Sequence, residues 1–525
     1  MARILIADTL ALEGIELLRA RHDVEVRTGL SEDELVAAVA DIQALVVRSQ
    51  TQVTARVIAA ATQLQVIGRA GVGVDNIDVG AATERGVTVV NAPLANTLSA
   101  AEHAFGLMLA LARHIPQAHA ALRAGRWDRN TYMGIELAGR TLGIVGLGRI
   151  GTEVSRRARA FQMRVVAFDP YVSPDRASTL GVELLDLDAL LAQSDFVTLH
   201  TALHEGTRHL INAERLAAAK RGVRIINTAR GALIDEQALF DAVESGQVAG
   251  AAIDVFSKEP AAGNILTTSD RIIVTPHLAA STVEAQDRAA TTVASEILDV
   301  LDGKPARFAV NAPLVDPETM AIIGPYVDAA ALAGRVASQL AKGQLQRVRL
   351  EFLGEIANYE LRPLRAAALI GLLERVSTQN VTIVNADQLA EQRGLRVEVE
   401  GGEAREPYAN LVVVQVTADV ERRVAATHTP SGVRVVGIDD YAVDIDPAHA
   451  PFVLMIENVD RPGAIGRVGT QLGAWGVNIR YMSVGAGTRE RALMVLGISR
   501  ALTADELRAL SALDNVFSAL QLELA

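Results

Sequence analysis

Two stretches of the chain alternate short apolar strands with amphipathic helices, and this alternation limits the possible folds more than any other feature. The first stretch begins with RILIAD and ends with VTVVNAP. The second begins after Arg140 with TLGIVGLG and continues through RVVAFDP, DFVTLHT, VRIINTA, GAAIDVF and RIIVTPH. Strands separated by helices form parallel sheets with helices on both faces. We therefore predict an α/β fold with two doubly wound parallel-sheet domains.

The pattern changes after about Lys304. The segment LDGKPARFAVNAP is a connector that contains proline and glycine, and mixed strands such as RVRLEFLGE and NLVVVQVTADV follow it. From about residue 450 the order is strand, helix, strand, strand, helix, strand, which is ferredoxin-like. We therefore expect an α+β domain and a small C-terminal domain after the two parallel sheets.

Composition excludes several classes of function. The formal net charge of -12 argues against nucleic-acid and acidic-membrane partners, which attract an excess of Lys and Arg. The chain has no cysteine, so disulfides, thiolate zinc sites and cysteine nucleophiles are excluded, and we expect no metal cofactor. The N-terminus lacks the basic region of a signal peptide. The apolar helical run AFGLMLALA is far shorter than the ~20 residues that span a bilayer. We expect a cytoplasmic protein.

The stretch GIVGLGRIG carries the G-x-G-x-x-G spacing of Gly146, Gly148 and Gly151. The first glycine permits a tight turn, the second a close approach of the pyrophosphate, and the third close packing of helix and strand. A plain glycine-rich turn is the alternative. It is disfavoured because a strand precedes the motif, a helix follows it, and Asp169 ends the next strand, where an acid binds the ribose hydroxyls. Pro and Tyr follow Asp169 instead of a basic residue, so NAD is preferred over NADP.

Three polar side chains follow successive strands of the second stretch. Arg230 follows VRIIN, Glu259 follows AAIDVF, and His277 follows RIIV. Ligands of open α/β sheets bind beyond the carboxyl ends of the strands. There a histidine can accept a hydroxyl proton, a carboxylate can fix its tautomer, and an arginine can grip a substrate carboxylate. Each residue alone has a structural explanation, but the three together predict a hydroxy-acid dehydrogenase site.

Several long motifs, in order, resemble the D-isomer-specific 2-hydroxyacid dehydrogenase family. They are GIVGLGRIG, NTARGALID, DVFSKEP and TPHLAAST, together with IGRAGVGVDNID and NAPLANTLSAAEHAFGLMLALAR. The resemblance spans essentially the whole chain and is strongest to the family's long-form branch, which oxidises 3-phospho-D-glycerate with NAD to 3-phosphohydroxypyruvate, opening L-serine biosynthesis. It implies that Arg230 binds the substrate, that Glu259 pairs with the histidine, and that His277 is the acid/base.

The same resemblance implies a set of cofactor contacts and two departures. The implied NAD contacts are Gly146, Gly148, Arg149, Ile150, Gly151, Asp169, Thr201, Thr228, Asp254 and the segment from His277 through Ala279 and Ala280. Val72 stands where relatives often carry Thr, so a hydroxyl contact is lost there. Ser257 stands where Glu is common, which is a milder difference.

The resemblance also implies that the cofactor domain is inserted into the substrate domain. Residues 1–96 and 284–306 would form the substrate-binding domain and residues 97–283 the NAD-binding domain, with a hinge at the two crossings. Arg48, Arg69, Gly71, Val72 and Asn96 would line the cleft from the far side, with Arg48 meeting a phosphate. Arg129 would add charge across a dimer contact. Surface salt-bridging is the alternative for Arg48 and Arg129.

The C-terminal third resembles the regulatory part of the long-form branch. Residues 307–447 would form an intervening domain for assembly, and residues 450–525 an ACT domain that senses a small molecule. Asn458, Asp460 and Asn478 are the candidate effector-binding residues for L-serine, because the family's serine site sits between two such domains. Turn chemistry is the alternative explanation for them. We expect a homo-oligomer, dimer or tetramer.

Two other functions remain open on the sequence. One is a glyoxylate or hydroxypyruvate reductase of the same family. The other is a binding protein that uses the fold to sense NAD(H).

Overall fold

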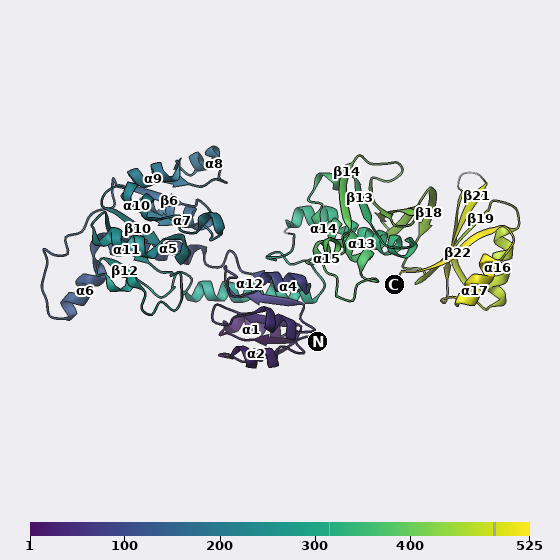
Figure 1. Ribbon diagram of the computed structural model, residues 1–525, viewed down its shortest axis with the longest axis horizontal. Helices are drawn as coiled ribbons and strands as arrows, with labels where there is room; N and C mark the ends of the chain where they lie inside the picture. Colours follow the sequence, from purple (N-terminus) through teal and green to yellow (C-terminus); the bar gives the residue numbers. More distant parts are fainter. Residues whose placement is uncertain (314, 487–489, 525) are drawn as a thin grey trace.

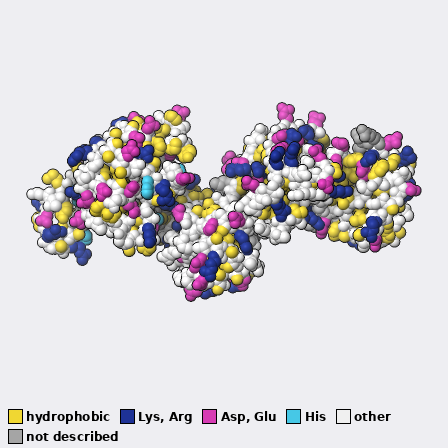
Figure 2. All heavy atoms as spheres, viewed as in Figure 1, with side chains coloured by type: hydrophobic (Ala, Val, Ile, Leu, Met, Phe, Trp, Pro, Cys, Tyr) yellow, Lys and Arg dark blue, Asp and Glu magenta, His cyan; other side chains and the backbone are white. Residues whose placement is uncertain are grey.

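The computed structural model describes residues 1–313, 315–486 and 490–524, and these residues form four sheets. The molecule is elongated (Figure 1): the unit with α5 to α11 lies at one end, the N-terminal unit comes next, and the two C-terminal units follow. In the space-filling view a notch separates the lobe with α5 to α11 from the two C-terminal units, and Lys and Arg are interspersed with Asp and Glu over the visible face (Figure 2).

The first sheet is parallel and has the order β2-β1-β3-β4-β5. Its strands other than the exposed edge strand β2 are nearly continuous apolar runs, as expected for a parallel sheet covered on both faces. The strands are β1 (Arg3–Ile6), β2 (Asp23–Val26), β3 (Ala44–Val47), β4 (Val66–Arg69) and β5 (Thr88–Asn91). The helices are α1 (Leu12–Arg19), α2 (Glu32–Ala38), α3 (Ala55–Ala60) and α4 (Val79–Glu84).

The second sheet is also parallel, with the order β12-β11-β10-β9-β6-β7-β8. The strands are β6 (Thr141–Val145), β7 (Arg164–Phe168), β8 (Glu183–Leu184), β9 (Phe196–Leu199), β10 (Val223–Asn227), β11 (Val248–Ile253) and β12 (Ile272–Val274). The helices are α5 (Thr97–Arg113), α6 (Ile115–Arg123), α7 (Arg149–Ala160), α8 (Pro174–Thr179), α9 (Leu187–Gln193), α10 (Ala213–Ala218) and α11 (Glu236–Glu244). The prediction of two doubly wound parallel sheets is confirmed.

The chain passes between the two sheets twice. It leaves the first sheet after β5 and enters the second unit through α5, whose apolar face packs on α7, β10 and β11. It returns through α12 (Val283–Leu301), which packs on α1, β4 and β5 of the first sheet. The hydroxyls of Ser99 and Thr282 lie 2.8 Å apart and join the two crossings. The Arg288 guanidinium adds a hydrogen bond to the Ala95 carbonyl at 2.9 Å.

The third sheet is mixed, with the order β14-β13-β15-β16-β17-β18. Its strands are β13 (Arg347–Gly354), β14 (Arg396–Gly402), β15 (Asn410–Thr417), β16 (Glu421–Thr429), β17 (Gly432–Ile438) and β18 (Tyr441–Ile445), and its helices are α13 (Pro317–Leu340), α14 (Arg362–Leu373) and α15 (Ala386–Gln392). By length and mean hydropathy of 1.2, Glu318–Leu340 of α13 would suffice to cross a membrane. The helix instead packs against α14, β15 and β16, which accounts for its apolar residues.

The fourth sheet is antiparallel, with the order β20-β21-β19-β22. Its elements are β19 (Phe452–Val459), α16 (Ala464–Ala474), β20 (Ile479–Ala486), β21 (Arg491–Ile498), α17 (Ala504–Ser511) and β22 (Val516–Glu523). The predicted ferredoxin-like order of the last unit is therefore confirmed.

The connector between the first and third sheets remains attached to the first. Val90 and Ala309 form an isolated antiparallel bridge, and the Asn311 side chain accepts a hydrogen bond from the Val89 amide at 2.8 Å. The expected boundary between residues 306 and 307 falls just before this bridge.

Candidate active site

A cavity of about 1020 Å³ lies between the carboxyl-terminal edges of the two parallel sheets. It brings together most of the substrate and catalytic residues named from the sequence. The first unit contributes Arg48, Arg69, Gly71, Val72 and Asn96, and the second contributes Arg230, Glu259, His277 and Ala280. Asn96 is the N-cap residue of α5 but makes no side-chain capping bond, so its amide remains available to a ligand in the cavity.

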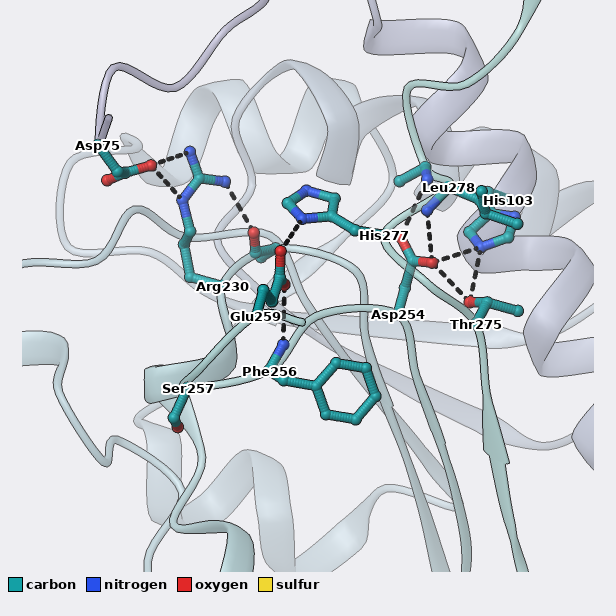
Figure 3. Close-up of polar contacts among 12 residues, drawn as sticks. Asp75, His103, Arg230, Asp254, Phe256, Ser257, Glu259, Thr275, His277 and Leu278 are labelled. Atoms are coloured by element: carbon teal, nitrogen blue, oxygen red, sulfur yellow. Dashed lines mark hydrogen bonds and ion pairs between the residues drawn. The ribbon is translucent and has the colours of Figure 1, made fainter. Parts of the chain in front are cut away.

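The imidazole of His277 is oriented by a carboxylate (Figure 3). Its Nδ1 lies 2.8 Å from Oε2 of Glu259, and the other carboxylate oxygen accepts a hydrogen bond from the Phe256 amide at 3.1 Å. Burial alone would raise the pKa of Glu259, but the hydrogen bonds from His277 and the Phe256 amide outweigh it and lower that pKa. Glu259 is therefore an ionised acceptor that keeps the proton on Nδ1, which leaves Nε2 free to exchange a proton with a ligand.

The guanidinium of Arg230 meets a carboxylate that comes from the other sheet. Asp75, in the loop after β4, places Oδ2 3.1 Å from both Nε and Nη2 of Arg230 (Figure 3). The Asp75 side chain is 73% exposed and the Arg230 side chain 33% exposed. The two nitrogens have the fork geometry that recognises a carboxylate, so Asp75 occupies the position that a substrate carboxylate would take.

Three arginines give the cavity a positive field. Burial, together with the neighbouring charges of Arg230 and Arg48, lowers the pKa of Arg69 to about 10, while the carboxylates of Asp75 and Asp8 oppose this shift. The Nε of Arg69 is buried and has no hydrogen-bond partner among the described residues. A bound anion would stabilise these like charges and would accept a hydrogen bond from the unused buried donor.

The glycine motif forms the turn between β6 and α7. Gly146 has a φ of +96°, which favours glycine, and a Cβ on Gly151 would lie 2.2 Å from the Gly146 carbonyl oxygen. Gly148 is the N-cap of α7, where the first amides of the helix have no helical acceptor. A Cβ on Gly148 would meet no atom of the described residues within 4 Å. The turn therefore leaves open space in front of free amides, as a pyrophosphate requires.

Other predicted cofactor contacts surround this turn. The Asp169 carboxylate accepts hydrogen bonds from the amides of Leu147 at 2.8 Å and Tyr171 at 2.9 Å, so it lies beside the glycine turn. Thr201 follows β9, and its amide would lie 3.0 Å from a Cβ on Gly146. The hydroxyl of Thr228 is buried and has no partner within the described part of the chain. An orphaned buried hydroxyl on this edge of the sheet fits a bound cofactor.

Asp254 differs from the other predicted cofactor contacts. Its side chain is fully buried and accepts hydrogen bonds from protein groups at both carboxylate oxygens. Ala279, one of the predicted contacts, donates one of these bonds, at 2.9 Å. The structure thus places Asp254 beneath the turn that carries His277, and its contact with NAD stays a prediction.

Of the predicted substrate- and effector-binding residues, four lie outside this cavity. Arg129 lies exposed in the 124–140 connection, away from the cavity. Asn458 is buried near the end of β19, and Asp460 is exposed just after that strand. Asn478 lies at the opposite end of the same sheet, next to the start of β19. The following residue, Ile479, pairs with Ile498, and Ile498 pairs in turn with Phe452, the first residue of β19. The six residue steps from Phe452 to Asn458 span roughly 20 Å at strand spacing. One chain therefore does not bring the three effector candidates together.

Two residues near the site were missed by the sequence reasoning. Asp75 lies in a loop of the first unit, so the argument from strand ends in the second unit does not reach it. His103 lies on α5 between residues of the helix's buried face, and the sequence around it predicts only an apolar helix. Its imidazole lies 3.2 Å from the Asp254 carboxylate, and sequence spacing gives no signal for that contact.

Comparisons with known proteins agree with this geometry. Residues 105–279 match the family described as D-isomer specific 2-hydroxyacid dehydrogenase, NAD binding domain, and residues 322–439 match the D-3-phosphoglycerate dehydrogenase intervening domain. The D-3-phosphoglycerate dehydrogenase of Archaeoglobus fulgidus is 41% identical over 99% of this chain and 100% of its own. That of Methanocaldococcus jannaschii is 44% identical over 92% of each.

The chain belongs to the D-3-phosphoglycerate dehydrogenase family. It is an NAD-dependent oxidoreductase of the D-isomer specific 2-hydroxyacid dehydrogenases. A solved glyoxylate reductase from Paecilomyes thermophila is also similar, with 34% identity and a TM-score of 0.55, and it covers 59% of this chain and 98% of its own. The intervening segment distinguishes this chain from that shorter relative.

The glycine turn generates the first testable prediction. Gly148→Ala should leave thermal stability within about 2 °C of the wild type and should weaken NADH binding at least tenfold, because the methyl group fills the space in front of the helix amides. Gly151→Ala should lower both the thermal stability and the NADH affinity, because its Cβ collides with the backbone of Gly146. NADH fluorescence titration and thermal unfolding measure the two effects. Unchanged NADH affinity in Gly148→Ala would place the pyrophosphate elsewhere.

Proposed function

We propose that this chain oxidises 3-phospho-D-glycerate to 3-phosphohydroxypyruvate with NAD, the first step of L-serine biosynthesis from glycolysis. The observation that carries the proposal is one cavity that holds a His277–Glu259 pair and three arginines. An acid/base beside several cations suits a hydroxy acid that carries two anionic groups. Relatives named D-3-phosphoglycerate dehydrogenase, similar over nearly their whole length, support the same substrate.

The catalytic residues divide the proton chemistry between them. Nε2 of His277 accepts the proton of the substrate hydroxyl, and Glu259 stabilises the imidazolium through Nδ1. NAD, when bound, accepts the hydride from the carbon that bears this hydroxyl. Arg230 holds the substrate carboxylate by its fork and orients the reacting carbon.

The far wall of the cavity binds the rest of the substrate. Arg48 and Arg69 receive the phosphate, and the buried Nε of Arg69 gains an acceptor there. The side chain of Asn96 and the backbone of Gly71 and Val72 complete that wall. This assignment explains why the cavity carries more positive charge than a small hydroxy acid without phosphate would need.

The cofactor and the domain division follow the same proposal. NAD binds along the second sheet at Gly146, Gly148, Arg149, Ile150, Gly151, Asp169, Thr201, Thr228, Asp254, Ala279 and Ala280. Residues 1–96 with 284–306 form the substrate-binding domain, and residues 97–283 the NAD-binding domain. Residues 307–447 form the intervening domain and residues 450–525 an ACT domain. The protein acts in the cytoplasm.

Assembly and feedback are part of the proposal. The α6 helix and the connection after it expose Ile115, Leu122, Trp127 and Met133, with Trp127 76% and Met133 78% exposed. An apolar surface of this kind favours a homo-oligomer, dimer or tetramer, in which Arg129 lies at the contact. L-Serine binds where Asn458 and Asp460 of one chain meet Asn478 of another, which fits their separation within a single chain.

Two alternative functions determine which controls the turnover experiment needs. The likeness to a glyoxylate reductase favours a reductase of small oxo acids as the second candidate. An NAD(H)-sensing protein would bind the cofactor without turnover.

The deciding experiment follows NADH formation by absorbance with NAD and either 3-phospho-D-glycerate or D-glycerate. The phosphorylated acid should give a kcat/KM at least a hundredfold higher, because its phosphate reaches Arg48 and Arg69 and charge-assisted contacts are worth about 1.5–3 kcal/mol each. Equal use of D-glycerate would remove the phosphate site from the proposal. Faster reduction of glyoxylate or hydroxypyruvate would favour the reductase, and NADH binding without turnover would favour the sensor.

The acid/base assignment has its own test. His277→Ala should lower kcat by about 10²–10⁴-fold, the usual contribution of general acid–base catalysis. NADH affinity should stay within about threefold of the wild type, because the substitution leaves the glycine turn intact. Stopped-flow turnover and NADH titration measure the two quantities. Wild-type kcat in this variant would show that the assignment is wrong.

The contact between Asp75 and Arg230 predicts competition with substrate. Asp75→Asn should lower KM for 3-phospho-D-glycerate about two- to fivefold, because an exposed ion pair is worth up to about 1 kcal/mol and the substrate no longer displaces it. The kcat should change little. Glu84→Gln, at an exposed position of α4, is the control for the same change in net charge. A higher KM in Asp75→Asn would instead make Asp75 an aid to substrate binding.

A further inference from the structure

The turn that carries His277 rests on a buried carboxylate. Asp254 follows β11 and is 0% exposed. Its Oδ1 accepts hydrogen bonds from the Leu278 amide at 2.8 Å and the Thr275 hydroxyl at 2.5 Å, and Oδ2 accepts one from the Ala279 amide at 2.9 Å. Asp254 therefore binds backbone or side-chain donors on both sides of His277 (Figure 3).

His277 itself has an unfavourable backbone conformation. Its φ is +56°, in the left-handed region that residues other than glycine rarely adopt. The His277 amide donates to the Asp254 carbonyl at 2.8 Å, in addition to the contacts of the Asp254 side chain with the next two amides. A strained conformation of this kind persists only when the surrounding structure determines it. The hydrogen bonds of Asp254 hold His277 in this conformation.

A side chain from another segment completes the arrangement. His103, on α5, places Nε2 3.2 Å from Oδ1 of Asp254 and 3.3 Å from the Thr275 hydroxyl, and 23% of its side chain is exposed. Burial alone would raise the pKa of Asp254, but the hydrogen bonds from His103, Thr275 and the two amides lower it. A buried charge is tolerated only when its acceptor positions are filled, so the donor on His103 contributes to the whole arrangement.

We propose that His103 is a positioning residue for the reaction: through Asp254 it holds the strained turn that presents His277 to the substrate. It does not touch the reacting atoms. Because α5 is the first helix after the chain crosses from the first sheet, His103 also fastens the acid/base turn to the crossing itself. The inference about catalysis rests on the proposed function.

A pair of substitutions at the same position tests the proposal. His103→Gln keeps an N–H donor close to the position of Nε2, whereas His103→Leu removes it at similar volume. We expect His103→Leu to lower kcat about 10- to 100-fold, since a displacement of about 1 Å in a catalytic group has effects of that order. KM for substrate should stay within about threefold. His103→Gln should stay within about threefold of wild-type kcat.

A second measurement reports on the turn without any substrate. The amides of Leu278 and Ala279 both donate to Asp254, so hydrogen exchange in a peptide covering residues 276–281 reads the arrangement directly. His103→Leu should accelerate that exchange at least tenfold, and His103→Gln should not. Thr275→Val removes another donor to the same carboxylate oxygen and should also accelerate the exchange. This variant replaces His103→Leu in the experiment if His103→Leu does not fold.

The outcomes separate this proposal from the proposed function. Unchanged kcat in His103→Leu, equal loss in the Leu and Gln variants, or a higher KM for NAD with normal kcat would each overturn the positioning role. If the wild type shows no turnover of 3-phospho-D-glycerate, the proposed function fails and the exchange experiment alone decides: faster exchange in His103→Leu but not in His103→Gln supports the arrangement, and equal exchange overturns it.

Discussion

The packing of α12 on the first sheet is the constraint on which the site depends. Gly14 of α1 lets the two helices approach closely, and Val293 and Ile297 of α12 lie over Gly68 of β4. This packing returns the chain to the unit where it began, so the strand ends of the two parallel sheets face one cavity. Without that return, the arginines of the first unit and the histidine of the second would not meet.

The chemistry of the cavity then follows from an imbalance of charge. Arg48, Arg69 and Arg230 converge on the cavity, and burial together with the charges of the other two arginines lowers the pKa of Arg69. The His277–Glu259 pair belongs to the second unit, as Arg230 does, and supplies the group that exchanges protons. The arginines of both units therefore select an anion, and the second unit also supplies the acid/base.

The sequence predicted the architecture and the residues at strand ends, because parallel sheets place such residues at one edge. Arg230, Glu259 and His277 indeed line one cavity. Local patterns could not predict contacts that depend on the relative placement of the two units, such as Asp75 with Arg230. They also could not show that Asp254 lies beneath the His277 turn, because burial depends on tertiary packing. The separation of Asn478 from Asn458 follows from strand order, which the sequence pattern does not give.

The internal ion pair on Arg230 changes the character of ligand binding. Because Asp75 bonds the same guanidinium nitrogens that a ligand carboxylate would take, binding at this position exchanges one carboxylate for another. The number of ion pairs on Arg230 is then conserved, and added salt weakens the competing contact along with the new one. The carboxylate end of a ligand should therefore respond weakly to ionic strength, and most of the salt dependence of affinity should come from the group that meets Arg48 and Arg69.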